Sequence, residues 1–453
     1  MVLKMALEPA IEERIEAERL KESRQLTERL SQQGGLDLEA MEFFVRSQVL
    51  AMGAKALEQF LGARLSHEKP PVCASKHLPC AMRLHERRKK TIRTILGEVS
   101  YERGRYVCPC CDAVRYPADE LLGVAGTGFS PGARRMMAHA GAFAPFGQGA
   151  QILDLFASVR VDPKDIERIA HSVGESVERW MGDQAAQAVG LAGCGAPLLE
   201  DPPQTLYVCF DATGTPVRRS ELQGVKGRQG EPKTRETKLG CVFTQSTLDD
   251  KGRPVRDEAS TSYVGAIESS SEFGYRIHGE AVRRGLHQAQ RVVIIADALA
   301  YNKSIVAEHF PKATFIIDLY HAREHLAAFA RALGIGLDTS WYRAARRILD
   351  KGQIDRLIQH MRERLPRSGP RRAEGLKQIA YCENNAEHMR YGRYRRQKLF
   401  VGSGVIEAGC RTVVGARLKG SGMRWSVPGA NAILALRCAI LSRRFEDYYE
   451  DAA

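Results

Sequence analysis

The chain has 453 residues, of which 44% are hydrophobic and 27% are charged. This length exceeds what one hydrophobic core usually organises, so about two to four domains are expected. The composition excludes a disordered chain, and no stretch reaches the roughly 18 apolar residues of a membrane span, so we expect no membrane partner. The first residues lack a long apolar run with a cleavage site, which favours a cytoplasmic, nucleoid-associated location.

The charge balance indicates the class of partner. The formal net charge is +13. Clustered Lys and Arg side chains attract polyanions, whose counterions are released on binding. Nucleic acid is therefore the first partner that the sequence suggests.

Two helices are predicted in the N-terminal segment, residues 1–70. Residues 8–31 are rich in Glu, Arg and Gln and carry apolar residues at helical spacing, which predicts a charged amphipathic helix. After two glycines, Asp37 can cap a second helix whose Met41, Phe44 and Val45 share one face.

Residues 71–125 form a cysteine-rich segment that we expect to be a small zinc-ribbon-like module. Five of the eleven cysteines lie between residues 73 and 111. In a chain without an export signal such crowding favours a metal site over a disulfide framework. The stretch 94–106 predicts a hairpin around Gly97.

The spacing of the cysteines suggests a structural Zn²⁺ site. Cys108 and Cys111 form a Cys-x-x-Cys pair. The predicted ligands are Cys73, Cys80, Cys108 and Cys111. The upstream pair departs from the usual spacing, and Cys110 offers another thiol, so unligated buried thiols remain the alternative. The flanking basic run from Arg83 to Arg93 would suit recognition of DNA.

Residues 126–195 are predicted to be a helical DNA-binding domain. Residues 150–156, the break at 160–163 and residues 164–174 have helix-turn-helix proportions. Two packed helices that bind nothing are the alternative interpretation, because helical hairpins are common.

The remainder of the chain changes character and predicts an α/β catalytic core. Residues 206–210, 238–245, 291–296 and 313–317 are short apolar runs typical of buried strands. We assign 204–325 to the first part of the core, 326–400 to a basic helical insertion and 401–453 to the C-terminal part of the core.

Carboxylates follow two of the predicted strands. Asp211 comes directly after 206–210, and Asp297 directly after 291–296. If the strands are neighbours, the two side chains converge and can bind a hard cation such as Mg²⁺, which prefers oxygen ligands. Alternatively, Asp297 could simply cap the helix that follows it.

Glu407 is the third candidate. It follows the glycine-rich run 402–406, in what we expect to be the first turns of a helix. Its alternative role is a capping interaction with Ser403, although the spacing of four residues departs from the ideal three.

Three sequence blocks surround the candidate carboxylates. The first opens at Asp211-Ala-Thr-Gly-Thr-Pro, and the second runs from Ile295-Ala-Asp297 to a segment ending at Leu326. The third runs from Gly402-Ser-Gly-Val-Ile-Glu407 to Trp425. In this order, the three blocks resemble transposases of the Kra group of insertion sequences. The similarity extends from residue 70 onward. One departure is Ala298, where the family usually has Gly.

The resemblance implies a DDE transposase with an RNase H-like fold, in which a mixed sheet carries two Asp residues and a helix after a helical insertion carries Glu. Asp211, Asp297 and Glu407 would then bind two Mg²⁺ (or Mn²⁺) ions for DNA cleavage and strand transfer. Asp318 and His321 resemble the Asp-x-x-His element of related transposases, a secondary site. A nuclease of the same fold that does not join DNA, or a domesticated DNA-binding protein without catalysis, are the competing hypotheses.

The expected partners are the terminal repeats of a mobile element and target DNA, bound by a homodimer or higher oligomer. Basic side chains near the predicted carboxylates are the expected phosphate contacts, and Trp425 is expected either to stack on a base or to pack. The predicted DNA-binding residues are Arg218, Arg219, Lys226, Lys233, Arg235, Lys238, Arg393, Arg395, Arg396 and Trp425.

Overall fold

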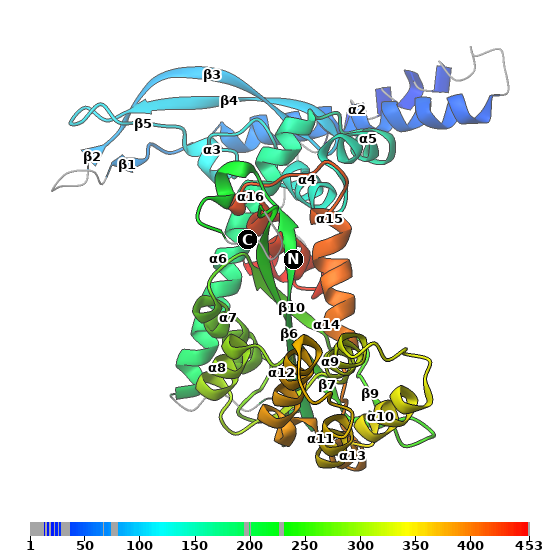
Figure 1. Cartoon of the computed structure of the whole chain (residues 1–453). Helices are drawn as coiled ribbons and strands as arrows, with labels where there is room; N and C mark the ends of the chain where they lie inside the picture. The colour runs from blue at the N-terminus through cyan, green and yellow to red at the C-terminus, as the bar shows by residue number, and fades with distance from the viewer. Residues whose placement is uncertain are drawn as a thin grey trace. The chain divides into compact units, whose positions relative to one another are not determined.

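The computed structural model describes residues 37–66, 68–73, 80–193, 199, 201–225 and 231–451, with scattered positions between 13 and 28. Those scattered positions are helical, and the rest of the predicted helix 8–31 lies outside the described residues. The chain forms two compact units, Met1–Ala170 and His171–Ala453 (Figure 1). In the described part of the chain, none of the helices combines the length and apolarity needed to cross a bilayer.

Helix α2 (Leu38–Leu65) of the first unit begins where the sequence predicted. Asp37 is its N-cap, and the Asp37 Oδ1 atom accepts a hydrogen bond from the Ala40 N–H at 3.2 Å. The C-terminal half of α2 buries Leu61 and Leu65 in a core shared with Val99. Burial of this apolar stripe fixes α2 on the strand that carries Val99.

A long antiparallel ribbon lies beside α2. It consists of β3 (Arg83–Thr94) and β4 (Gly97–Val107), extended at one end by β5 (Val114–Arg115). The turn is at residues 95–96, with Gly97 at a φ of 123°, a conformation that glycine adopts without strain. The prediction of a hairpin over 94–106 was therefore wrong in extent, because the first arm is the basic run from Arg83. Most of these basic side chains are exposed, which hid the strand from a search for alternating apolar residues.

Short elements complete the first unit. They are β1 (Val72–Cys73), β2 (Cys80–Ala81), α3 (Pro117–Leu121), α4 (Pro131–Phe143), α5 (Phe146–Ala157) and the start of α6 (Pro163–Gly193). Helices α5 and α6 lie on either side of the predicted break. Helix α6 continues to Gly193, well beyond the residue 174 expected for the second helix of a helix-turn-helix.

The second unit contains a five-stranded mixed sheet, so its architecture is α/β as predicted. The strand order is β10 (Ser262–Ala266), β7 (Thr234–Gln245), β6 (Thr205–Pro216), β11 (Arg291–Ala296) and β12 (Thr314–Ile317). The first three strands are antiparallel neighbours, and β6, β11 and β12 are parallel. All four predicted strands are confirmed, whereas β10 was missed.

Helices cover both faces of this sheet, and helices also fill the segment 326–400 that was predicted to be a helical insertion. They are α7 (Ser270–Arg283), α8 (Ala300–His309), α9 (Leu319–Ala332), α10 (Ser340–Asp350), α11 (Ile354–Arg362), α12 (Pro370–Asn384), α13 (Tyr391–Arg396), α14 (Gly404–Gly409), α15 (Ala416–Leu418), α16 (Val427–Leu441) and α17 (Phe445–Asp451). Short 3-10 turns span Arg219–Leu222 and Ala386–Met389, and β8 (Thr247–Leu248) pairs with β9 (Pro254–Val255).

Two glycines show how closely the helices approach the sheet. A Cβ atom added at Gly240 of β7 would lie 2.5 Å from Ile277 of α7. A Cβ atom added at Gly409 of α14 would lie 2.8 Å from the ring of Tyr263 in β10. Because Tyr263 pairs with Cys241, one residue beyond Gly240, α7 and α14 lie on opposite faces of the sheet.

Candidate active site

Asp211 lies on the face of the sheet that α14 covers. It pairs with Leu239, and a Cβ atom at Gly409 of α14 would also contact Leu239, at 3.3 Å. The prediction that Asp211 ends its strand was wrong, because β6 continues to Pro216. Strand β7 pairs with it over this whole length, and the buried Thr215 and Thr237 hydroxyls share a hydrogen bond of 2.6 Å. Asp211 is thus held mid-strand, in a rigid ladder.

Asp297 follows the last residue of β11, as predicted. Strand β11 is parallel to β6 with Ile295 beside Cys209, so Asp297 comes beside Asp211 two residues later. The Asp297 Oδ1 atom accepts hydrogen bonds from the Leu299 N–H at 3.1 Å and from the Asn302 amide. These bonds tie Asp297 to the turn before α8 and to Asn302 within it, but the N-cap of α8 is Leu299, so Asp297 is not the cap considered as its alternative role.

His321 completes a cluster with the two aspartates. One potential ligand atom from each of Asp211, Asp297 and His321 lies within 4.8 Å of the others. Burial alone would lower the pKa of the His321 imidazole, but nearby carboxylates, with Asp318, Asp211 and Asp297 foremost, raise it above its usual value. A protonated His321 would balance part of the negative charge that the two strands bring together.

The electrostatics of Asp211 also reflect this crowding. Burial raises its pKa, and repulsion from the carboxylates of Asp297 and Glu407 adds to the rise. The Ala212 N–H, which donates to Asp211 Oδ1 at 2.7 Å, and His321 oppose it. A bound cation would relieve the repulsion between these carboxylates, so the residues present fit a divalent metal.

Glu407 approaches the cluster from α14 but stands outside the group within 4.8 Å. Its Oε1 atom accepts a hydrogen bond from the Ser403 hydroxyl at 2.9 Å. Three residues after Glu407, the Cys410 Sγ atom is 4.0 Å from Asp211 Oδ2, so this helix lies directly beside Asp211. The predicted pairing with Ser403 is real, yet it joins two side chains and does not cap the helix backbone.

Asp318, the predicted secondary residue, links the two halves of the site. Its side chain is fully buried and accepts hydrogen bonds from the His321 N–H at 3.0 Å and from the Ser403 N–H at 2.7 Å. It caps α9, which carries His321, and holds the residue that contacts Glu407. Each Asp318 oxygen thus accepts one backbone N–H, one at the start of α9 and one at Ser403, just before α14.

The helix that carries Glu407 is followed by a π-helical segment, Cys410–Gly415. Such segments are frequent at functional sites because they change the direction and spacing of side chains. Arg437 of α16, 3% exposed, donates a hydrogen bond to the Val413 carbonyl at 2.6 Å and another to the Thr412 carbonyl. Arg437 thereby supports the distorted turn beside Asp211.

We expect Arg437→Met to reduce the rate of any reaction at this site by roughly tenfold, since the Val413 and Thr412 carbonyls lose a donor, and an unpaired buried carbonyl such as that of Val413 costs about 1–3 kcal/mol. Steady-state kinetics should show the loss in kcat, with substrate affinity unchanged. Arg437→Lys, which keeps a donor, should restore part of the rate. An equal loss in both variants with a lowered melting temperature would instead mean that Arg437 only stabilises the fold.

The basic residues predicted to contact DNA do not share one environment. Arg218, Arg219 and Lys233 are exposed near the end of β6, whereas Lys226 lies outside the described residues. Lys238 is 7% exposed, and its ammonium group contacts the Glu268 carbonyl and the Glu236 carboxylate, each at 2.9 Å. The prediction that Lys238 contacts DNA was therefore wrong, because strand β7 points it into the protein.

Two other predicted contacts are better explained as internal supports. Trp425 is 7% exposed; its indole N–H donates to the Leu418 carbonyl at 3.1 Å, and the Arg417 guanidinium covers the ring at 4.9 Å. The ring is thus buried with a guanidinium over it, so it is not available to stack on a base in this conformation. Arg235 donates to the Glu221 carbonyl at 3.1 Å and so holds a loop turn against β7.

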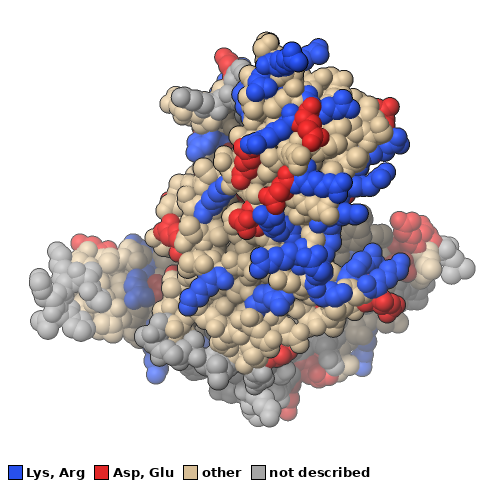
Figure 2. Space-filling view, turned by 60° about the horizontal axis from the view of Figure 1, so that its bottom comes forward, with Lys and Arg blue, Asp and Glu red and all other residues tan. Residues whose placement is uncertain are grey.

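A basic face covers the helical insertion. Figure 2 brings forward the end of the unit that carries α10 and α13, and Lys and Arg clearly outnumber acidic residues on it. The exposed cations of these elements are Arg343, Arg346, Arg347, Lys351, Arg393, Arg395 and Arg396. The α10 cations recur at helical spacing, so they line one side of that helix. Arg395 also donates to the Asp350 carbonyl, which ties α13 to the end of α10.

Lys419 is a cation near the site that the sequence did not predict. This exposed residue donates a hydrogen bond to the Thr213 hydroxyl, two residues along β6 from Asp211 and on the same face. It lies in the third resemblance block, but a lone Lys in a glycine-rich segment carries no signal of its own. Only the fold, which brings Lys419 to Thr213 of β6, reveals a cation next to the carboxylates.

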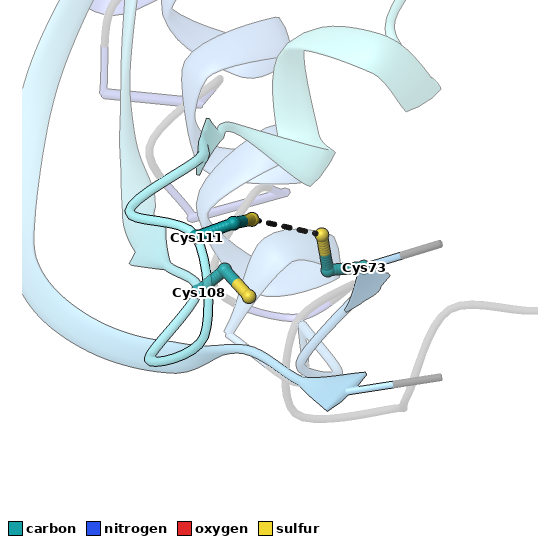
Figure 3. A group of neighbouring side chains, drawn as sticks. All are labelled: Cys73, Cys108 and Cys111. Atoms are coloured by element: carbon teal, nitrogen blue, oxygen red, sulfur yellow. Dashed lines mark hydrogen bonds between the residues drawn. The ribbon is translucent and has the colours of Figure 1, made fainter. Parts of the chain in front are cut away.

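Three of the four predicted zinc ligands, Cys73, Cys108 and Cys111, lie together, whereas the fourth, Cys80, belongs to a second group of sulfurs. Cys73, Cys108 and Cys111 form one group of neighbouring sulfurs (Figure 3), and Cys80, Cys108 and Cys110 form another. The Cys73 and Cys111 sulfurs are 3.6 Å apart, close to the roughly 3.8 Å edge of a tetrahedron with Zn–S bonds of about 2.3 Å. The Cys110 and Cys80 sulfurs are 3.0 Å apart. The donor set fits zinc, with Cys110 as a competitor for one ligand position.

Comparisons with known proteins leave the family open. No family model and no curated protein matches the chain. Among solved structures, a chain of the Drosophila P element transposase strand transfer complex is similar with a TM-score of 0.34 and 10% identity, covering 73% of this chain and 96% of that chain. A likeness this distant defines neither a fold family nor a function.

Proposed function

We propose that this protein is a DDE-type DNA transposase of the insertion-sequence kind, with an RNase H-like catalytic core. The observation that carries the proposal is the convergence of Asp211 and Asp297 from neighbouring parallel strands, with the helix of Glu407 packed beside Asp211. The strand and helix origins of these carboxylates agree with what the resemblance to Kra-group transposases implies. The motif order Asp, Asp, Glu and the helical insertion before Glu407 support the same proposal.

Asp211 and Asp297 are the proposed principal metal ligands, with Glu407 as the third. Divalent ions held there would supply an activated water or 3′-hydroxyl and would stabilise the leaving oxygen. His321 adds a nitrogen donor to the oxygen set, a combination that suits Mn²⁺ better than Mg²⁺, because Mg²⁺ prefers oxygen ligands. Asp318 and Arg437 are proposed to position the elements that carry these ligands.

The proposed substrates are the ends of a mobile element and a target DNA. Lys419 beside Thr213 would hold a phosphate near the carboxylates, and Arg218, Arg219 and Lys233 would hold phosphates further along, at the end of β6. The basic face of α10 and α13 would bind DNA further from the reacting phosphate. A zinc-bound cysteine module and the α5–α6 segment are proposed to recognise the ends. Synapsis of two ends would require at least a dimer.

The proposal is tested by incubating the purified protein and Mn²⁺ or Mg²⁺ with labelled DNA that carries the two ends of its own element and with a supercoiled target plasmid. A transposase should release 3′-hydroxyl ends and join them to the plasmid. Cleavage without joined products would identify the competing nuclease. Binding of ends without cleavage under either metal would identify a domesticated DNA-binding protein.

A further inference from the structure

A pocket lies beyond Asp211, where β6 ends. Its volume is about 830 Å³, within the roughly 300–1,000 Å³ range of small-ligand sites. Three cations line it, Arg219, Lys233 and Arg424, against one carboxylate, that of Glu231. Apolar surface comes from Leu222, Val225, Pro232 and Met423. The pocket therefore combines a cationic rim with an apolar surface, the two features that a nucleotide needs for its phosphate and its base.

Hydrogen bonds hold the walls of this pocket in place. On one side, Arg235 donates to the Glu221 carbonyl and fixes the turn that carries Arg219 and Leu222. On the other side, Trp425 forms a β-bridge with Val217. The Trp425 N–H donates to the Pro216 carbonyl at 3.2 Å, and the Trp425 carbonyl accepts a hydrogen bond from the Arg218 N–H at 2.8 Å. This bridge anchors Met423 and Arg424 beside the strand end. Because these walls are already ordered, a ligand can bind without the loss of conformational entropy that ordering them would cost.

The pocket is connected to the carboxylates by the strand itself. From Asp211 to Pro216 is five residues, or on the order of 17 Å along an extended strand. Lys419 lies between them, at Thr213. A DNA strand that reacts at Asp211 and follows this cationic path would reach the pocket about five nucleotide steps away, at about 3.4 Å per step in duplex DNA.

We propose that this pocket receives one unpaired nucleotide of the DNA strand that lies across Asp211. Its phosphate would contact Arg219, Lys233 and Arg424, and its base would pack against Met423 and Leu222. The three cations are exposed, whereas the apolar residues Leu222 and Met423 are half-buried. A base that packs against them must therefore leave the duplex, because a paired and stacked base would not reach them. The inference rests on the proposed function, since it assumes that DNA is the substrate, and it names where the strand leaves the duplex.

The test uses the full-length protein and two probes, a blunt 20-base-pair duplex and the same duplex with a single-stranded tail of six thymidines. 5-Iododeoxyuridine replaces each thymidine of the tail in turn. We expect tighter binding of the tailed duplex, and a photocrosslink from one tail position to the peptide that contains Met423. Met423→Ala should reduce both the crosslink and the preference for the tail, while affinity for the blunt duplex stays unchanged.

A charge-matched pair of variants separates the pocket from general electrostatics. The triple variant Arg219→Gln, Lys233→Gln, Arg424→Gln should bind the tailed duplex roughly tenfold more weakly, with the salt dependence of log K reduced by about two. The control removes three exposed cations outside the pocket, Arg179→Gln, Arg256→Gln and Lys377→Gln. Equal losses in both triples, or crosslinks that avoid the Met423 peptide while element ends are still cleaved, would overturn the pocket alone. Failure to bind either probe would instead overturn the proposed function.

Discussion

Replacing Asp211 with Asn is expected to reduce the rate of DNA cleavage by well over 100-fold. Mutation of a residue that only supports a metal ligand typically costs about 10-fold to 100-fold, and the loss of a ligand itself should cost more. Asn has almost the shape of Asp and can still accept the hydrogen bond from the Ala212 N–H. What it loses is the charge that would hold the metal, while the basic surfaces stay intact. Affinity for element ends should therefore change little, as measured by fluorescence anisotropy.

Protein stability provides an internal control for this variant. Burial and the neighbouring carboxylates raise the pKa of Asp211 in the folded protein, so above that pKa its ionised form opposes folding. Asp211→Asn should then leave the melting temperature without divalent metal unchanged or slightly raised. The wild-type protein should gain stability when Mn²⁺ is added, and the variant should gain much less. A cleavage defect accompanied by a lower melting temperature would mean misfolding, and would count against a direct role for Asp211.

Asp297→Asn and Glu407→Gln should abolish cleavage in the same assay and should also leave end binding nearly intact. The proposed ligand role of Glu407 has less geometric support than that of Asp297, because its carboxylate lies outside the group formed by Asp211, Asp297 and His321. A Gln side chain at position 407 can keep the hydrogen bond with the Ser403 hydroxyl, so a loss of cleavage in Glu407→Gln would be due to the lost negative charge. Any of these variants that still cuts at about a tenth of the wild-type rate would be removed from the proposed ligand set.

The sequence predicted the parts of the core that depend on buried apolar runs. Strand β11 has the predicted bounds, and Asp297 follows it as expected. Strand β6 was cut short because Gly214 and Pro216 are typical of loops, and only its long pairing with β7 keeps them in a strand. Strand β10 was not predicted for a similar reason. Its run Ser-Tyr-Val-Gly-Ala is short and contains small residues, and its burial depends on packing against α16 and β7.

Side-chain roles were harder to predict than positions along the chain. Lys and Trp are residue types that often contact DNA, but tertiary packing buries both Lys238 and Trp425. His321 was ranked second to Glu407, yet it is the residue whose ring meets the two aspartates. The direction in which α9 runs from the sheet decides whether the histidine of an Asp-x-x-His element lies within the site or only supports it. No spacing in the sequence reports that direction.

Replacing Cys108 with Ser is expected to unfold the cysteine-rich end of the first unit. Zinc binding in small modules contributes roughly 10 kcal/mol or more, and this energy is also folding energy. Cys108 is fully buried and belongs to both sulfur groups, so its loss would disrupt either ligand set. The apolar cluster around it, with Met82 and Tyr106, is small and could not replace the metal. Zinc content should fall, proteases should cut between residues 68 and 115, and affinity for element ends should weaken while the carboxylate chemistry persists.

Cys110→Ser distinguishes the two sulfur groups. Cys110 is exposed and its sulfur is 3.0 Å from that of Cys80, so it is a ligand only if zinc occupies the group of Cys80, Cys108 and Cys110. With the predicted ligands Cys73, Cys80, Cys108 and Cys111, this variant should retain stoichiometric zinc and normal end binding, whereas Cys111→Ser should lose both. The opposite pattern would move the metal to the exposed group. Wild-type protein purified without zinc, together with a Cys108→Ser variant that binds ends normally, would leave these thiols as buried side chains without a ligand role.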